Sequence, residues 1–205
     1  HGYKLFEWNM NKNTYNFKIN EYQDNFNDGI ICITNPNSFS GSCLKMEEIK
    51  WILKNAKHNN KLVLLDIVYS EYSSLLMDEY KELCYEYLNL IIINSFSKSH
   101  GLAGARIAYV YSNPEIIKYL KKWNFNSTID ILSYQICLLI LENYKYELQK
   151  IREQIINNRK ILLNILTNKN LQAFDSEGNF ILVNLKSEKE KEKVRMALSK
   201  NRLLV

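Results

Sequence analysis

The segment Ser95–Arg106 brings together groups that can hold a small anionic ligand. It follows an apolar run and contains hydroxyls at Ser95 and Ser97, an amine at Lys98 and a guanidinium at Arg106. Hydroxyls, loop amides and the planar guanidinium can share the oxygens of a phosphate, a task for which arginine is better shaped than lysine. Lys98 is therefore free for another role. A lysine held among apolar neighbours becomes available to condense with an aldehyde as a Schiff base.

Two further polar residues follow the preceding apolar run, at 62–65. Asp66 ends that run, so its carboxylate would lie at the rim of a dry sheet and would need a cationic partner. A pyridinium nitrogen is one such partner, and Tyr69 can donate from its phenol to an oxygen on the same ring. An acid for a ring nitrogen, a phenol for a ring oxygen, a lysine for an aldehyde and a cup for a phosphate together describe pyridoxal 5′-phosphate.

The elements that must position these residues alternate along the chain. Ligands in open α/β sheets bind outside the carboxyl ends of the strands, which is where these polar residues fall. The runs are apolar on both faces, a pattern typical of strands buried under helices. The spacing predicts strands at 30–34, 62–66, 90–94 and 107–111, and helices at 46–58, around 80–87, after Pro114 and at 129–142.

A long helical pattern over 146–166 leads into a shorter second part. Its apolar residues recur at threes and fours, which predicts one buried face and a solvated side that carries Arg152 and Arg159. The sequence beyond it predicts a strand at 180–185, a helix at 188–199 and a strand at 202–205. His100, two residues after Lys98, is interpreted as an ordinary loop residue.

The overall composition excludes several classes of function. The 205 residues are 46% hydrophobic and 24% charged, with a formal charge of 27 − 22 = +5 that is spread along the chain, which argues against nucleic-acid binding. The apolar runs are far shorter than the ~18 residues of a spanning helix, so we expect no membrane segment and a cytoplasmic protein. The four cysteines and three histidines show no ligand spacing, so no metal site is expected.

The polar residues described above resemble the fold type I aminotransferases of class I and II. The pattern is most similar to the branch that includes histidinol-phosphate aminotransferases and threonine-phosphate decarboxylases. The resemblance extends over 30–205 and is carried by Ser-x-Ser-Lys-x-x-Gly-Leu-Ala-Gly-x-Arg at 95–106, by Asp66 with Tyr69, by the loop 35–41 and by Asn179-Phe180. It implies an α/β, PLP-dependent transferase fold: a large domain with a mostly parallel sheet between helices, and a smaller α/β carboxy-terminal domain.

The resemblance also implies a role for each matched residue. The catalytic residues would be Lys98, which forms the Schiff base, Asp66 at the ring nitrogen and Tyr69 at the ring hydroxyl. The phosphate ligands would be Ser95, Ser97 and Arg106.

The loop 35–41 departs from the family pattern. The family commonly has Asn-Pro-Asn-Asn-Pro-Thr-Gly, whereas this chain has Asn-Pro-Asn-Ser-Phe-Ser-Gly. The asparagine that bonds the ring hydroxyl in the family is therefore replaced, and either Ser38 or Asn37 would bind the cofactor in its place.

The activity that the resemblance implies is a PLP-dependent aminotransferase. It would move an amino group between an amino acid or related amino compound, phosphorylated or not, and a 2-oxo acid. Two alternatives stay open, namely a phosphoamino-acid decarboxylase and a degenerate, non-catalytic relative. Family members are roughly twice this length and build their site at a dimer interface. We therefore expect a homodimer, an incomplete large domain at 1–145 and, at 146–205, a bridging helix with the start of the small domain.

Overall fold

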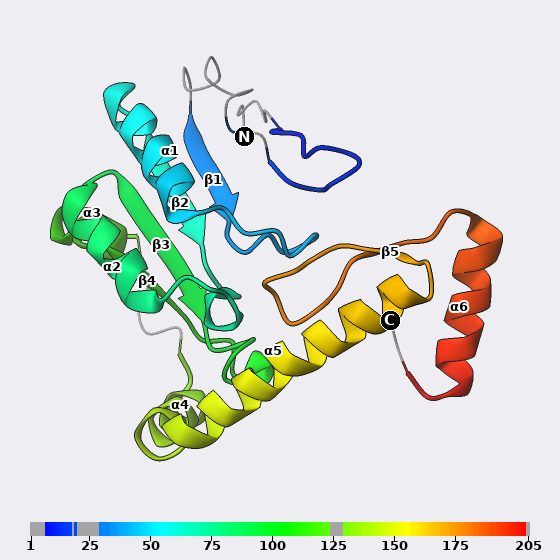
Figure 1. The fold of residues 1–205 in the computed structure, drawn as a ribbon. Helices are drawn as coiled ribbons and strands as arrows, with labels where there is room; N and C mark the ends of the chain where they lie inside the picture. The colour runs from blue at the N-terminus through cyan, green and yellow to red at the C-terminus, as the bar shows by residue number, and fades with distance from the viewer. Residues whose placement is uncertain (1–6, 18, 20–28, 124–128, 204–205) are drawn as a thin grey trace.

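A four-stranded mixed sheet forms the centre of the first part of the chain (Figure 1). The computed structural model describes residues 7–17, 19, 29–123 and 129–203. In spatial order the strands are β1 (Ile30–Thr34), β2 (Leu62–Asp66), β3 (Leu90–Ser95) and β4 (Ala108–Ser112). The first three are parallel and β4 is antiparallel to β3. All four predicted strands are confirmed, the last two with ends shifted by one residue.

The described residues also form six α-helices and two short 3₁₀ turns. They are α1 (Met46–His58), α2 (Met77–Glu86), α3 (Pro114–Lys121), α4 (Ile131–Asn143), α5 (Lys145–Asn168) and α6 (Glu188–Lys200), with η2 (Ser70–Tyr72) and η3 (Ala103–Ala105). Several starts follow from local chemistry. Asn113 accepts two backbone N–H bonds ahead of Pro114, and the side chains of Asp130 and Ser187 cap α4 and α6.

The hydrophobic core lies on one face of the sheet. Side chains of β2 and β3 on that face pack against α1 and α2. The core residues there include Val63, Leu65, Leu90 and Ile92 from the strands and Ile52, Leu53, Tyr80 and Leu83 from the helices. The opposite face carries Cys32, which is exposed, and Leu64 and Ile93, which are partly buried. We expected helices over both faces. Within the described residues α1 and α2 cover one face, and strand alternation turns every second side chain toward the other.

The helix α5 leads from the sheet to the second part of the chain. It runs from α4 past the carboxyl-end side of the sheet toward β5 (Gln172–Ala173) and α6 (Figure 1). The predicted strand at 180–185 pairs only over β6 (Val183–Asn184), which is antiparallel to β5. The predicted strand at 202–205 is wrong where it can be seen. Arg202 has a positive φ of 58°, and the Leu203 N–H bonds back to Leu198 in a helix-terminating turn, while 204–205 lie outside the described residues.

Among the described residues, no helix combines the length and the apolar character that crossing a membrane requires.

Candidate active site

The three predicted polar segments begin at the same edge of the sheet. Strands β1, β2 and β3 are parallel, so their carboxyl ends meet, and the register sets Thr34 beside Asp66 and Asp66 beside Ile93. The loop 35–41 follows β1, Asp66 closes β2, and the segment with Lys98 follows the end of β3. The structure therefore brings together the segments that the sequence separates by about thirty residues each.

Lys98 and Tyr69 are neighbours at this edge. The Lys98 Nζ lies 5.3 Å from the centroid of the Tyr69 ring. That ring is buried and meets Phe180 edge to face at 5.3 Å. The Lys98 side chain itself is exposed, contrary to the apolar surroundings expected from the sequence. The loop carries it beyond the packed strand, and the aromatic face of Tyr69 is the apolar surface beside it.

Asp66 is a half-buried carboxylate that lacks a cation. Among the described residues, no lysine, arginine or histidine forms an ion pair with it. Burial raises its pKa, and the backbone N–H of Val68, which donates to Oδ1 at 3.0 Å, lowers it in part. A carboxylate that is desolvated at a sheet edge is stabilised by a positively charged ligand. This is the feature expected of a group that faces a pyridinium nitrogen.

The predicted phosphate ligands lie on the loop between β3 and β4. Ser95 pairs with Ala108 at the end of the antiparallel ladder, and its Oγ accepts the Ser97 N–H at 3.3 Å. Arg106 has a left-handed φ of 54°, is exposed, and donates from Nη1 to the Ala103 carbonyl at 3.2 Å. Hydroxyls and a guanidinium from one loop are thus available at the same edge as Lys98.

The side chain of Asn37 builds the turn that follows β1. Its Oδ1 accepts from the N–H groups of Phe39 and Ser40, each at 3.0 Å, and its Nδ2 donates to Thr34 Oγ1 at 3.2 Å. Ser38 is exposed at the tip of this turn. Asn35 is fully buried, where it bonds Leu44 and the Tyr80 hydroxyl. The side chains of Asn37 and Asn35 thus hold the turn, which leaves Ser38 free to face a ligand.

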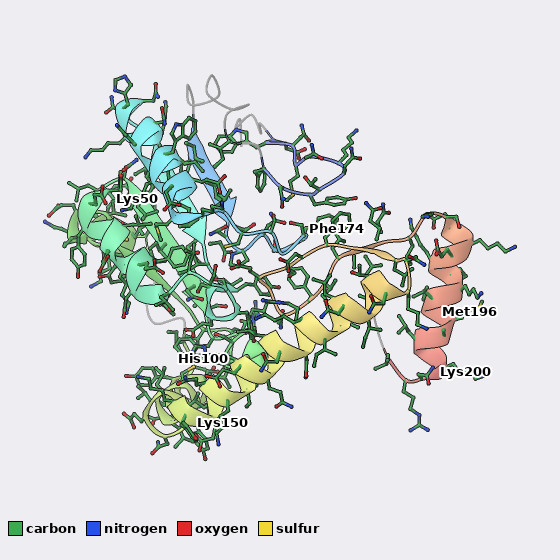
Figure 2. All side chains as sticks on the ribbon, in the orientation of Figure 1. Lys50, His100, Lys150, Phe174, Met196 and Lys200 are labelled. Atoms are coloured by element: carbon green, nitrogen blue, oxygen red, sulfur yellow. The ribbon has the colours of Figure 1, made fainter. Side chains whose placement is uncertain are left out.

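The second part of the chain closes against this turn. The Glu177 N–H donates to the Gly41 carbonyl at 2.7 Å, and a Cβ at Gly41 would lie 1.9 Å from Ser176 Oγ. Gly41 also has a φ of +76°, so glycine is required there twice over. Figure 2 shows Phe174 beside the turn. The centroids of the Phe174 and Tyr15 rings are 4.8 Å apart, with the rings edge to face.

Two arginines of α5 lie in unexpected surroundings. Arg152, predicted to be solvated, has a side chain only 17% exposed that pairs with Glu71 at 2.6 Å. Arg159, also predicted to be solvated, is half-buried and donates to the carbonyls of Tyr72 and Gly178. Two turns of helix separate them, so both face η2. The spacing of seven residues indicates that Arg152 and Arg159 lie on one side of the helix, but it cannot show whether that side meets the sheet edge.

His100 makes more contacts than the ordinary loop residue that the sequence predicted. It is partly buried, its ring centroid lies 4.8 Å from that of Phe96 with the two planes tilted by 53°, and its Nε2 lies 3.2 Å from an Arg152 nitrogen. Figure 2 shows it where the loop after β3 approaches α5.

Two hollows of the described surface lie elsewhere. They measure about 210 and 380 Å³ and share Cys43, Leu44 and Lys45 in their linings. Burial, with Glu177 as a secondary cause, raises the pKa of the Cys43 thiol to about 12, so it is not a nucleophile there. Among the described residues, no three histidine, cysteine or acidic side chains gather as they would to hold a metal ion.

Comparison with known proteins identifies the family to which this arrangement corresponds. The family model described as aminotransferase class I and II matches residues 2–205. The chain belongs to this family. A histidinol-phosphate aminotransferase of Sulfurisphaera tokodaii is 34% identical over 186 residues, which are 89% of this chain and 51% of that protein. The resemblance to that branch is confirmed, and the chain spans about half the length of the curated relatives it matches.

Solved structures show the same fold. The histidinol-phosphate aminotransferase of Sinorhizobium meliloti, in complex with pyridoxal-5′-phosphate, superposes with a TM-score of 0.78 at 21% identity, over 96% of this chain and 54% of that one. The L-threonine-O-3-phosphate decarboxylase of Porphyromonas gingivalis gives 0.71 at 22%, over 84% and 52%. The expected fold class is therefore confirmed: an α/β chain with a mostly parallel, mixed sheet and the fold type I architecture.

Proposed function

We propose that this chain carries the cofactor-binding centre of a PLP-dependent aminotransferase. The observation that supports it most directly is the meeting of Lys98 with the buried Tyr69 ring, one strand end away from Asp66. Family membership supports the same reaction class. The residues present fit the cofactor, because Asp66 is a half-buried carboxylate whose raised pKa calls for a cation, and hydroxyls and a guanidinium lie on the Lys98 loop.

Each residue would then have a defined task. Asp66 holds a proton on the ring nitrogen, and Tyr69 donates to the ring oxygen. Lys98 would hold the aldehyde group of the cofactor through Nζ, and its amine would carry the proton of the substrate α-carbon. When bound, pyridoxal phosphate supplies the aldehyde and an electron-withdrawing ring.

The remaining site residues orient the cofactor. Ser95, Ser97 and Arg106 would bind the phosphate and so fix the tilt of the ring relative to Lys98. Of the two candidates for the missing asparagine, we favour Ser38, because both ends of the Asn37 amide are already used within the turn.

The wider assignments rest on the family resemblance and on the arrangement of the chain. We propose that 1–145 belong to the large domain and that 146–205 comprise the bridging helix and the start of the small domain. The four-stranded sheet of the first part and the separate β5–β6 pair support this division. We propose a homodimer on the resemblance alone, and a cytoplasmic location on the composition and the short apolar runs of the sequence. The substrates would be an amino compound as donor and a 2-oxo acid as acceptor.

The test of the proposal is covalent trapping at Lys98. Purified full-length protein is mixed with pyridoxal phosphate, reduced with borohydride and digested, and the labelled peptide is identified by mass spectrometry. We expect a visible absorption band that reduction abolishes, with the label on Lys98. A Lys98→Ala variant should lose both the band and the label, while Lys118→Ala, on the exposed surface of α3, should keep them. Labelling that persists in Lys98→Ala would refute the assignment.

The reaction is then identified from its products. Amino donors should remove the visible band and release a 2-oxo acid. Release of carbon dioxide without an oxo acid would instead indicate the decarboxylase whose fold this chain shares. A band that persists with every amine would indicate a relative without catalytic activity.

A further inference from the structure

Arg152 connects the long helix α5 to the loop that carries Lys98. Its Nη1 forms a short ion pair with Glu71 Oε2 at 2.6 Å. Its Nε donates to the Ser99 carbonyl at 3.3 Å, and its Nη2 lies 3.2 Å from His100 Nε2. Three different nitrogens thus make three different contacts, a pattern that the rigid fork of arginine allows and a lysine does not.

The contact with Arg152 fixes the protonation of the His100 ring. A guanidinium can only donate, so His100 Nε2 must accept, and the ring proton then lies on Nδ1, 3.0 Å from Ser99 Oγ. Burial, and after it the positive charge of Arg152, lowers the pKa of His100 to about 4. Glu71, the other charged group at this contact, is paired with Arg152. The ring is therefore neutral, oriented and held against Phe96.

The backbone of Lys98 is held from the same side. The Tyr72 hydroxyl donates to the Lys98 carbonyl at 3.1 Å, and Tyr72 belongs to η2, which also supplies Glu71. Residues 98, 99 and 100 are thus each bonded to η2 or to α5. The amine that projects from this backbone is exposed, so the anchoring behind it, more than packing around it, sets where Nζ lies.

We propose that Arg152 is a positioning residue for Lys98: from the bridging helix it holds Ser99 and His100, and thereby places the lysine amine beside Tyr69. The inference rests on the proposed function of Lys98 and adds to it a residue far along the chain. It also means that a displacement of α5 relative to the sheet would move Ser99 and His100 through Arg152, and with them the neighbouring Lys98.

Arg159 provides a matched control. It lies on the same helix, its guanidinium is also partly buried and it also bonds η2, through the Tyr72 carbonyl. Its other contact is the Gly178 carbonyl, and within the part of the chain that the structure describes it forms no hydrogen bond with residues 98–100. Replacing either arginine by methionine removes a half-buried guanidinium from α5, but only one replacement releases the lysine loop.

The experiment compares Arg152→Met and Arg159→Met in the full-length protein, with Arg152→Lys as a second variant that keeps the charge and lacks the fork. The first readout is the rate at which subsaturating pyridoxal phosphate is trapped on Lys98 by borohydride, per folded molecule. Since a small misplacement of a reacting group can cost on the order of 10²-fold, we expect Arg152→Met and Arg152→Lys to slow trapping by about tenfold or more. Arg159→Met should trap like the parent protein. Equal trapping rates in Arg152→Met and Arg159→Met would overturn the proposal.

A second readout needs no cofactor. Reductive methylation of Lys98 with formaldehyde, followed by mass spectrometry, and the ¹⁵N chemical shifts of the His100 ring are measured in the protein without pyridoxal phosphate. We expect Arg152→Met to change the Lys98 methylation rate and to move the His100 proton from Nδ1 toward Nε2, with Arg159→Met unchanged in both. If the parent protein fails to trap pyridoxal phosphate, the proposed function fails, and this readout alone decides the role of Arg152. Unchanged methylation and an unchanged tautomer in Arg152→Met would sink it.

Discussion

Two regions of the molecule differ in how completely they bury their apolar side chains. One is the sheet with α1 and α2, and the other is the helix pair α4 and α5. In the first region the apolar positions are the buried ones, and Leu65, Leu53 and Leu90 are all 0% exposed. In the second, Leu132 is 72% exposed and Ile161 is 57% exposed, while Arg152 turns inward. Helical periodicity is clear in both α1 and α5, so periodicity alone does not tell how completely a face is covered.

The difference follows from where the covering surface lies. For β2 and β3 it is supplied by α1 and α2, which are close in sequence and connected by short loops. For α5, the surface that it meets is the polar edge formed by η2 and the Lys98 loop, whose free carbonyls and Glu71 require donors. Arginines satisfy that edge, and isoleucines cannot. The contact face of α5 therefore contains these two arginines together with the partly buried Ile155, Ile156 and Leu163.

Leu65→Ala tests the first half of the comparison and should have the largest effect. Leu65 is completely buried between the sheet and α1, so truncation leaves a cavity and should lower the free energy of unfolding by about 2–5 kcal/mol. Urea denaturation measures it. Leu132→Ala makes the same chemical change at an exposed site on α4 and should cost well under half as much. Equal losses would show that the two regions do not differ in packing.

Gly41→Ala tests the contact between the turn that follows β1 and the segment around Ser176, beyond the end of α5. Alanine at a φ of +76° is strained, and its Cβ would overlap Ser176 Oγ, with the Ser176 Cα only 3.0 Å away. We expect a loss of about 2–4 kcal/mol in unfolding free energy. Gly29→Ala is the matched control, because Gly29 has a φ of +86° with no atom near the added Cβ, so that only the backbone strain of about 1–2 kcal/mol remains. The prediction fails if the two substitutions cost the same.

Most elements of the fold could be predicted from the sequence, and most contacts of the site could not. Strands β1 and β2 and helix α1 have the predicted boundaries, because continuous apolar runs and helical spacing are local signals. The gathering of Asp66, Tyr69 and Lys98 required a rule about strand ends in addition to the residues themselves. The contacts of Arg152 with Glu71 and His100 join residues more than fifty positions apart. Nothing in the local pattern of α5 encodes such a pairing.

The pH dependence of stability tests whether the His100 ring is buried and neutral at its contact with Arg152 of α5. Because the pKa of His100 falls from 6.5 to about 4 on folding, the unfolded chain binds more protons between these values. The contribution of His100 is therefore fully present above pH 6.5 and is lost as the pH falls toward 4.

The full shift would exceed 3 kcal/mol at ~1.36 kcal/mol per unit. The ring is only partly buried, so we expect a loss on the order of 1–2 kcal/mol after solvent screening. Unfolding free energies of the parent protein and of His100→Gln, measured by urea denaturation from pH 7 to pH 4, isolate this term. The burial of Asp66 acts with the opposite sign near the lower end of this range and cancels in the difference. Parallel pH profiles for the two proteins would contradict a buried, neutral His100.

Ile161→Ser should have the smallest effect and is the sharpest test of the second region. If another surface covered Ile161, the substitution would cost several kcal/mol. The structure leaves that side chain 57% exposed, and isoleucine and serine have similar helix propensities, so we expect a change within about 0.5 kcal/mol. The measurement is the urea midpoint at constant m-value, made at low protein concentration. A loss above about 2 kcal/mol in the full-length protein would mean that another surface covers Ile161.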